Sequence, residues 1–185
     1  LSIRRQRQMC IRDSISAISV AASAAIGVGS SGLAFSGAGA VAINTIAGST
    51  DALLVKSTAK ATQNINLFAL SDARISATIA SLSVSIAGGA GTGVGASIGI
   101  SVARNLIGQE GFGTVGESAI ATVRALLEDS AVSTLGNVSL SADASQSIDA
   151  VVFSGSAAVA GGGGTGLAAS GSGVWAENQI GTRVR

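Results

Sequence analysis

The amino-acid sequence predicts an all-β repeat protein with glycine-rich turns, and three observations carry this prediction. The chain of 185 residues contains 26 Gly, no Pro and no His, and only 3% of its residues are aromatic. Glycine is therefore well above the roughly 7% that globular proteins average. One pattern of residues returns three times along the chain, and inside each copy small and larger side chains alternate, as they do along a strand.

The repeat is a block of 27 residues that aligns without a gap at residues 18–44, 79–105 and 152–178. Thirteen positions after its start, each block has a small hydroxyl residue followed by Gly. Each block ends in an Asn-x-Ile sequence, which begins at Asn44, Asn105 and Asn178. Such a constant spacing predicts that one structural unit recurs in all three copies.

The connections between the blocks, residues 45–78 and 106–151, also share an element. It begins at Asn64 in the first connection and at Asn137 in the second. The second connection is 12 residues longer, and we place the extra residues at 109–120 as a surface insertion. Because the third copy stops at Arg185 before its connection begins, we expect the chain to be a piece of a longer array, truncated at the C-terminus.

Side chains within the block alternate with a period of two, which predicts strands rather than helices. Small residues occupy every second position of the second block, at Gly95, Ser97, Gly99, Ser101 and Ala103. Glycine clusters in the middle of each block permit positive φ angles and a tight reversal. Each block is therefore predicted to form two long strands joined by a glycine turn.

Two architectures fit this pattern: a parallel β-solenoid, in which successive copies stack along an axis, and a β-hairpin array, in which each block folds back on itself. We favour the solenoid. The recurring Asn residues would suit ladders stacked along its axis, although Asn is also common in turns because it tolerates left-handed φ.

Residues 1–13 differ from everything that follows. They contain four of the eleven basic residues, the single Cys (Cys10) and the single Met (Met9). The string resembles translated sequencing-adapter read-through at the ends of proteins predicted from metagenomic assemblies, so we treat residues 1–14 as a non-native leader. Without it, seven basic and nine acidic residues remain, a net charge of −2. No basic patch is left, and we expect no nucleic-acid partner.

The residues also resemble a known family. The blocks have a run of small residues, then Thr-Gly and Asn-x-Ile, and a connection such as Gly-Asn-Val-Ser-Leu-Ser-Ala follows. These repeats are similar to those of filamentous haemagglutinin-like and leukotoxin-type filamentous adhesins of bacteria. The resemblance implies an exported β-rich stalk, secreted or held at the cell surface. It implies neighbouring repeats of the same chain as partners, and host or surface ligands bound by regions outside this segment.

The sequence contains no recognisable catalytic machinery, and we expect no enzymatic activity, no cofactor and no metal site. Without His, and with Cys only in the leader, the usual general bases and thiol nucleophiles are missing. The one adjacent acidic pair, Glu128-Asp129, is predicted to be a solvated turn. The glycine string at residues 91–95 has no βαβ context for a nucleotide loop, and no Asp follows residues 161–164 as a calcium-binding β-roll would require.

The alternative function is a glycine-rich segment that inserts into a membrane or forms a pore. Residues 15–50, 75–103 and 150–176 contain no charged residue, and each stretch is long enough to span a bilayer. Their Ser and Gly content and their small alternate face favour the stalk instead. We therefore expect no membrane partner.

Overall fold

The computed structural model describes residues 7–108 and 120–185, and every regular element in these ranges is a β-strand. The all-β prediction is confirmed. The strands are β1 (Arg7–Ile46), β2 (Thr50–Val55), β3 (Thr58–Ala61), β4 (Ile65–Ile107), β5 (Ala121–Glu128), β6 (Ala131–Thr134), β7 (Val138–Gly162), β8 (Thr165–Ile180) and β9 (Thr182–Val184).

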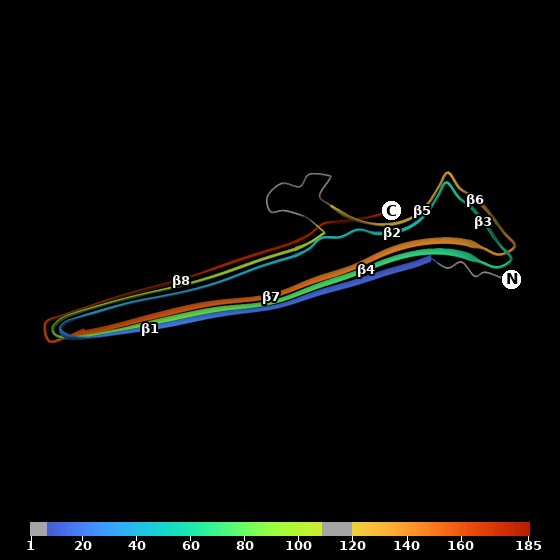
Figure 1. Cartoon of the computed structure of the whole chain (residues 1–185). Coiled ribbons are helices and arrows are strands. Elements are labelled where there is room, and N and C mark those ends of the chain that lie inside the picture. The colour runs from blue at the N-terminus through green and yellow to red at the C-terminus, as the bar shows by residue number, and fades with distance from the viewer. Residues whose placement is uncertain (1–6, 109–119) are drawn as a thin grey trace.

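The strands of successive copies pair in parallel. The largest sheet has the order β1-β4-β7, and β8 also pairs with β4. Smaller sheets form from β2, β5 and β9, and from β3 and β6. Figure 1 shows the copies as traces that follow one another along the whole length of the molecule. The chain is therefore built of parallel sheets in which each copy lies beside its neighbour.

The path of one copy is clearest in β4. This strand runs outward, reverses at its glycine cluster and returns, after which β5 and β6 lead back to the start of β7 (Figure 1). We call the stretch before the cluster the outgoing arm, residues 65–89 in β4, and the stretch after it the return arm, residues 92–107. The predicted pair of long strands joined by a glycine turn is confirmed.

The register confirms the repeat and corrects it in one place. The second and third copies pair with the predicted offset, for example Asn105 with Asn178. In the first copy, however, the outgoing arm is shifted, so that Ile18 pairs with Thr78 rather than with Ile79. The gapless alignment was wrong here because the first turn is one residue shorter, with the shift between Gly29 and Ser31. A one-residue slip would turn every side chain of this arm to the opposite face.

The register also brackets the predicted insertion. Ile46 pairs with Ile107, whereas Thr50 pairs with Val123, so the extra residues of the second copy lie between Ile107 and Val123. Apart from Ile120, the predicted insertion at residues 109–120 lies outside the described residues. The start of β1 at Arg7 places residues 7–13 of the predicted leader beside residues 67–73 of β4.

The interior lies between the two arms and is thin. Near the glycine turn it is filled by small side chains, including Ser83 and Ser97, which are almost completely buried. A Cβ added to Gly99 would come within 2.6 Å of the carbonyl oxygen of Gly155 in the opposite arm. Larger side chains, among them Ile75 and Ile79, are fully buried farther from the turn, where the arms diverge (Figure 1). The predicted close-packed small face is confirmed.

The glycines of the turn are needed for close approach rather than for unusual backbone angles. Within the described ranges, Gly108 is the glycine with positive φ, and it lies outside the clusters. A Cβ on Gly27 would overlap the backbone carbonyl of Leu33, and one on Gly32 would overlap that of Gly88. The reversal was therefore predicted correctly, but the reason for its glycines was not. They are needed because neighbouring segments of backbone come too close together to leave room for a Cβ.

Candidate functional site

The interior holds a network of serine hydroxyls that joins the two arms and links neighbouring copies. Ser83 Oγ lies 2.5 Å from Ser97 Oγ across the interior, and Ser81 Oγ lies 3.0 Å from Ser154 Oγ of the next copy. Ser101 donates to the carbonyl oxygen of Phe153 at 2.7 Å, and its Oγ lies 2.9 Å from Ser81 Oγ. The partners of these hydroxyls are other hydroxyls and a backbone carbonyl, which cannot activate a serine as a nucleophile. The network satisfies buried polar groups.

An asparagine ladder runs across the copies at the far end of the return arms. Asn44 Nδ2 donates to Asn105 Oδ1 at 2.7 Å, and Asn105 Nδ2 donates to Asn178 Oδ1 at 2.7 Å. Asn105, in the middle, is completely buried. At the other recurring position, Asn64 Oδ1 accepts a 2.9 Å hydrogen bond from the backbone N–H of Asn137. The ladder interpretation is confirmed for the first set, and the second set bonds to the backbone beside the turns.

Two well-formed ion pairs also connect equivalent positions of neighbouring copies. Arg124 donates from Nε and Nη2 to the two carboxylate oxygens of Asp51, at 2.8 and 2.7 Å. The hydrogen bonds from Arg124 lower the pKa of Asp51 below its ordinary value, and the bonds to the carboxylate raise the pKa of Arg124. Arg104 bonds to Glu177 at 2.8 Å and lies 5.4 Å from the ring centroid of Trp175. Both pairs tie one copy to the next.

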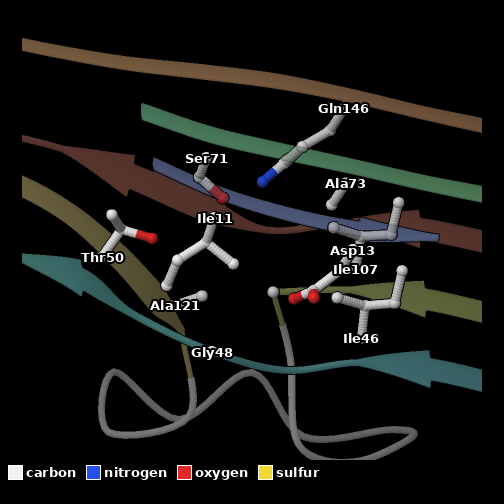
Figure 2. Close-up of a pocket in the computed structure, with 11 residues that line it drawn as sticks. Ile11, Asp13, Ile46, Gly48, Thr50, Ser71, Ala73, Ile107, Ala121 and Gln146 are labelled. Atoms are coloured by element: carbon white, nitrogen blue, oxygen red, sulfur yellow. The ribbon is translucent and has the colours of Figure 1, made fainter. Parts of the chain in front are cut away.

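A small cavity lies where the first part of β1 passes the ends of the return arms (Figure 2). Its volume is about 40 Å³, which is room for water molecules rather than for an organic substrate. Its polar lining comes from Asp13, Thr50, Ser71 and Gln146, and Gln146 also bonds to Thr182 Oγ1. The lining offers a single carboxylate and no second titratable group for acid–base chemistry.

A second cavity of about 100 Å³ is apolar. It is lined by Leu53, Leu54, Ala59, Ile65 and Leu67, together with Ser57 and Thr58. Nothing in this lining titrates near neutral pH or supplies a typical metal ligand. The cavity therefore belongs to the packing between the short strands and the start of β4.

The residues considered for chemistry from the sequence occupy structural positions. Glu128 ends β5 and Asp129 follows it with φ of 47°, both exposed, so the predicted solvated turn is confirmed. The glycine string at residues 91–95 passes from the turn into a strand, without the helix N-terminus that a dinucleotide fingerprint needs. Among the described residues, no group of three or more His, Cys, Asp or Glu side chains could hold a metal ion.

The most extensive feature that could contact another molecule is the outer surface of the arms. Because the small side chains point inward, the larger apolar ones of each strand point outward. Ile26, Phe35, Ile98 and Trp175 are 73%, 67%, 58% and 56% exposed. Sequence reasoning missed this surface, although its signal was present. Once the small alternate face is assigned to the interior, the intervening apolar positions must face outward.

Comparison with protein-family models, with curated proteins and with solved structures finds no match to this chain. Across the described ranges, no helix has the length and apolar character needed to cross a membrane.

Proposed function

We propose that this chain is a structural repeat segment of an exported bacterial surface adhesin or fibre, in which the copies wind as a parallel β-solenoid and form an extended stalk. The observation that carries the proposal is the stacking of equivalent residues, above all Asn44, Asn105 and Asn178 in one hydrogen-bonded row. A unit that places each residue beside its own equivalent can be extended indefinitely in one direction.

The pairing of the strands supports a solenoid over a hairpin array. Parallel pairing joins each copy to the next, whereas a hairpin array would pair the two arms of one block with each other in antiparallel fashion. Each added copy would lengthen the stack by one strand spacing, about 4.8 Å. A stalk of roughly 100 Å would therefore need about 20 copies. Such a segment acts by mechanical extension and needs no substrate or cofactor.

Export and attachment to a surface are inferred from the resemblance of the repeats to filamentous adhesins. The uniform, weakly charged composition after the first residues agrees with a spacer rather than with a ligand-binding tip. Host or surface ligands would be bound by regions outside this segment.

Lengthening the array tests the proposal directly. Residues 106–178 contain one connection and one block, so chains with about 20 to 40 extra tandem copies of this stretch can be compared by small-angle X-ray scattering. The arms lie across the stacking axis and are about 80 Å long, so once the stack exceeds this length the maximum dimension should grow by about 4.8 Å per copy while the cross-section stays constant. Growth in the cross-section would contradict the solenoid. Antibody labelling of intact cells that produce the full-length protein tests export, and labelling only after permeabilisation would contradict it.

A membrane-inserting or pore-forming segment is the second candidate, and the outward apolar side chains of both arms favour it. Flotation with phosphatidylcholine vesicles and release of a trapped dye distinguish the two functions. A stalk should neither float with the vesicles nor release the dye, whereas a membrane-inserting segment should do at least the first.

A further inference from the structure

The outer surface of the return arms has a distinctive relief. We call it the return face: the outward side chains of residues 33–43, 94–104 and 167–177. Large apolar groups are exposed along it, with Leu33 and Leu167 each 60% exposed. Within these three ranges the only charged side chains are Arg104 and Glu177 at one end, and these two form an ion pair with each other. An uncharged partner surface could therefore cover the face without leaving a charge unpaired.

The relief consists of a ridge between two grooves. Ile98 and Ile100 project from the central strand, 58% and 51% exposed. Their partners in the first copy are Gly37 and Gly39, and those in the third copy are Gly171 and Gly173. A row of two large side chains is thus flanked on both sides by positions that have no side chain.

Nothing in residues 7–108 and 120–185 requires these four glycines. A Cβ added to Gly171 or Gly173 would meet nothing within 4 Å, and one added to Gly37 or Gly39 would meet only a carbonyl oxygen at 4.0 Å. In this described part of the chain, none of the four has positive φ. Glycine weakens the interior of a strand, and it often marks a place where another molecule or another backbone approaches closely.

We propose that the return face binds the return face of a second copy of this chain. The isoleucine ridge of each chain would enter a glycine groove of the other chain. The two return faces would then be displaced by one strand relative to each other. This arrangement is isologous, because a two-fold axis relates the two ridge-in-groove contacts. The surface is its own complement, and this identifies a second copy as the occupant. The inference stands whether or not the array serves as a stalk.

The area of overlap sets the strength of such a pair. Eleven residues along the strands and the two strands that overlap after the displacement give roughly 36 by 10 Å, or about 700 Å² buried over both chains. This is below the limit of about 1,000 Å² for a stable specific interface and is in the range of weak, transient contacts. Two chains of this length should therefore associate weakly. Each additional repeat with the same relief would add area in proportion, so longer arrays should associate more tightly.

The outer surface of the outgoing arms differs and provides an internal control. There the strand glycine Gly155 is covered by its own neighbours, since an added Cβ would lie 3.1 Å from Leu82 Cδ1 and 3.5 Å from the ring of Phe153. This surface is apolar, with Leu82 and Phe153 exposed by 50% and 59%, but its groove is already filled. A bilayer adapts to any apolar relief, so it would not distinguish between the two faces.

Sedimentation equilibrium of the full chain over a range of concentrations tests the proposal, with a reducing agent present because Cys10 is exposed. The unchanged chain should show a monomer–dimer equilibrium. The valine variant, Gly37→Val, Gly39→Val, Gly171→Val and Gly173→Val, fills the glycine positions on both sides of the ridge, and the serine variant, Ile98→Ser with Ile100→Ser, removes the ridge. Each of these two variants should raise the dissociation constant at least about tenfold. Leu82→Ser on the outgoing face should leave it unchanged.

The valine variant keeps the test decisive because every position that it changes has room for a side chain. Its new Cβ atoms meet no atom closer than 4.0 Å, and valine favours strands, so its circular dichroism and urea midpoint should match or exceed those of the unchanged chain. A monomer at every concentration would overturn the proposal, and so would a dimer that the valine and serine variants both leave intact. Flotation with phosphatidylcholine vesicles that the serine variant abolishes, without any dimer, would overturn it too and assign the face to a bilayer instead.

Discussion

Asn105 donates a hydrogen bond of 2.7 Å from its side-chain amide to Oδ1 of Asn178, although 73 residues separate them in the sequence. Asn105 also accepts the equivalent bond from Asn44, so a completely buried amide is satisfied from both sides by its own equivalents. A shift of one residue along the strand would break both bonds at once. The ladder therefore helps to fix the register of the stacked copies.

Substitution of Asn105 by Ala should destabilise the fold more than the same change at Asn178. Asn105→Ala removes two hydrogen bonds and leaves the buried amide of Asn44 without an acceptor, so the free energy of unfolding should fall by about 1–3 kcal/mol. Asn178 is exposed at the end of the ladder, so water can replace it as the acceptor for Asn105 Nδ2, and its loss should cost less than about 1 kcal/mol. Urea titrations followed by circular dichroism measure both values. Equal costs would contradict this prediction, because the centre of the ladder would then contribute no more than its exposed end.

A large side chain at Gly99 should be poorly tolerated, because this position points into the thin interior. An added Cβ would already lie 2.6 Å from the carbonyl oxygen of Gly155, so Gly99→Leu should destabilise by at least about 1–3 kcal/mol. Gly173→Leu is the matched control on the return arm of the third copy, where the new side chain enters open space. Its urea midpoint should stay within error of that of the unchanged chain. The assignment of the small face to the interior fails if both variants are equally stable.

Much of the fold could be predicted from the repeat itself. The constant position of Asn44, Asn105 and Asn178 within their blocks predicted which residues pair, and the alternation around Gly99 predicted strands with one closely packed face. The one-residue shift in the outgoing arm of the first copy could not be predicted from aligned letters. In the sequence Ile18 and Ile79 look equivalent. In the structure Ile18 points outward and Ile79 is buried, so Ile18 pairs with Thr78 instead.

The candidate interaction surface was harder to predict than the fold. Apolar residues at alternate positions are normally assigned to a core, and in the sequence Ile98 and Ile100 are simply the larger face of a strand. They lie outside because the opposite arm packs against Ser97, Gly99 and Ser101 instead. Hydroxyl groups can line an interior only when they find partners across it, and these pairings depend on distances between arms that the sequence does not contain.

The ion pair between Asp51 and Arg124 should make stability depend on pH. The folded pKa of Asp51 lies below its ordinary value of 3.8, so its stabilising contribution is present above that value and is lost as the pH falls through the folded pKa. Asp51→Asn should lower the free energy of unfolding at neutral pH by about 0.5–1 kcal/mol, as expected for a partly exposed bidentate pair. The difference between the variant and the unchanged chain should shrink as the pH falls well below 3.8.

Asp72→Asn is the control for this experiment. The partner of Asp72, Arg12, is 82% exposed and makes a longer contact of 3.2 Å, so this substitution should change stability little at any pH. Thermal unfolding at a series of pH values measures both variants. A cost for Asp51→Asn that does not vary with pH would show that the charge on the carboxylate is not what stabilises the pair.

Two neighbouring serines should respond to the same substitution with opposite signs. Ser83 Oγ is bonded to Ser97, whereas among the described residues Ser85 Oγ is the buried side-chain atom that has no hydrogen-bond partner. Ser83→Ala leaves Ser97 unsatisfied in the interior and should cost about 1–3 kcal/mol. Ser85→Ala removes an unsatisfied hydroxyl and should stabilise the fold by up to about 1 kcal/mol. The urea midpoints of the two variants measure both effects. If Ser85→Ala lost as much stability as Ser83→Ala, the Ser85 hydroxyl would have to have a hydrogen-bond partner, and the prediction would be wrong.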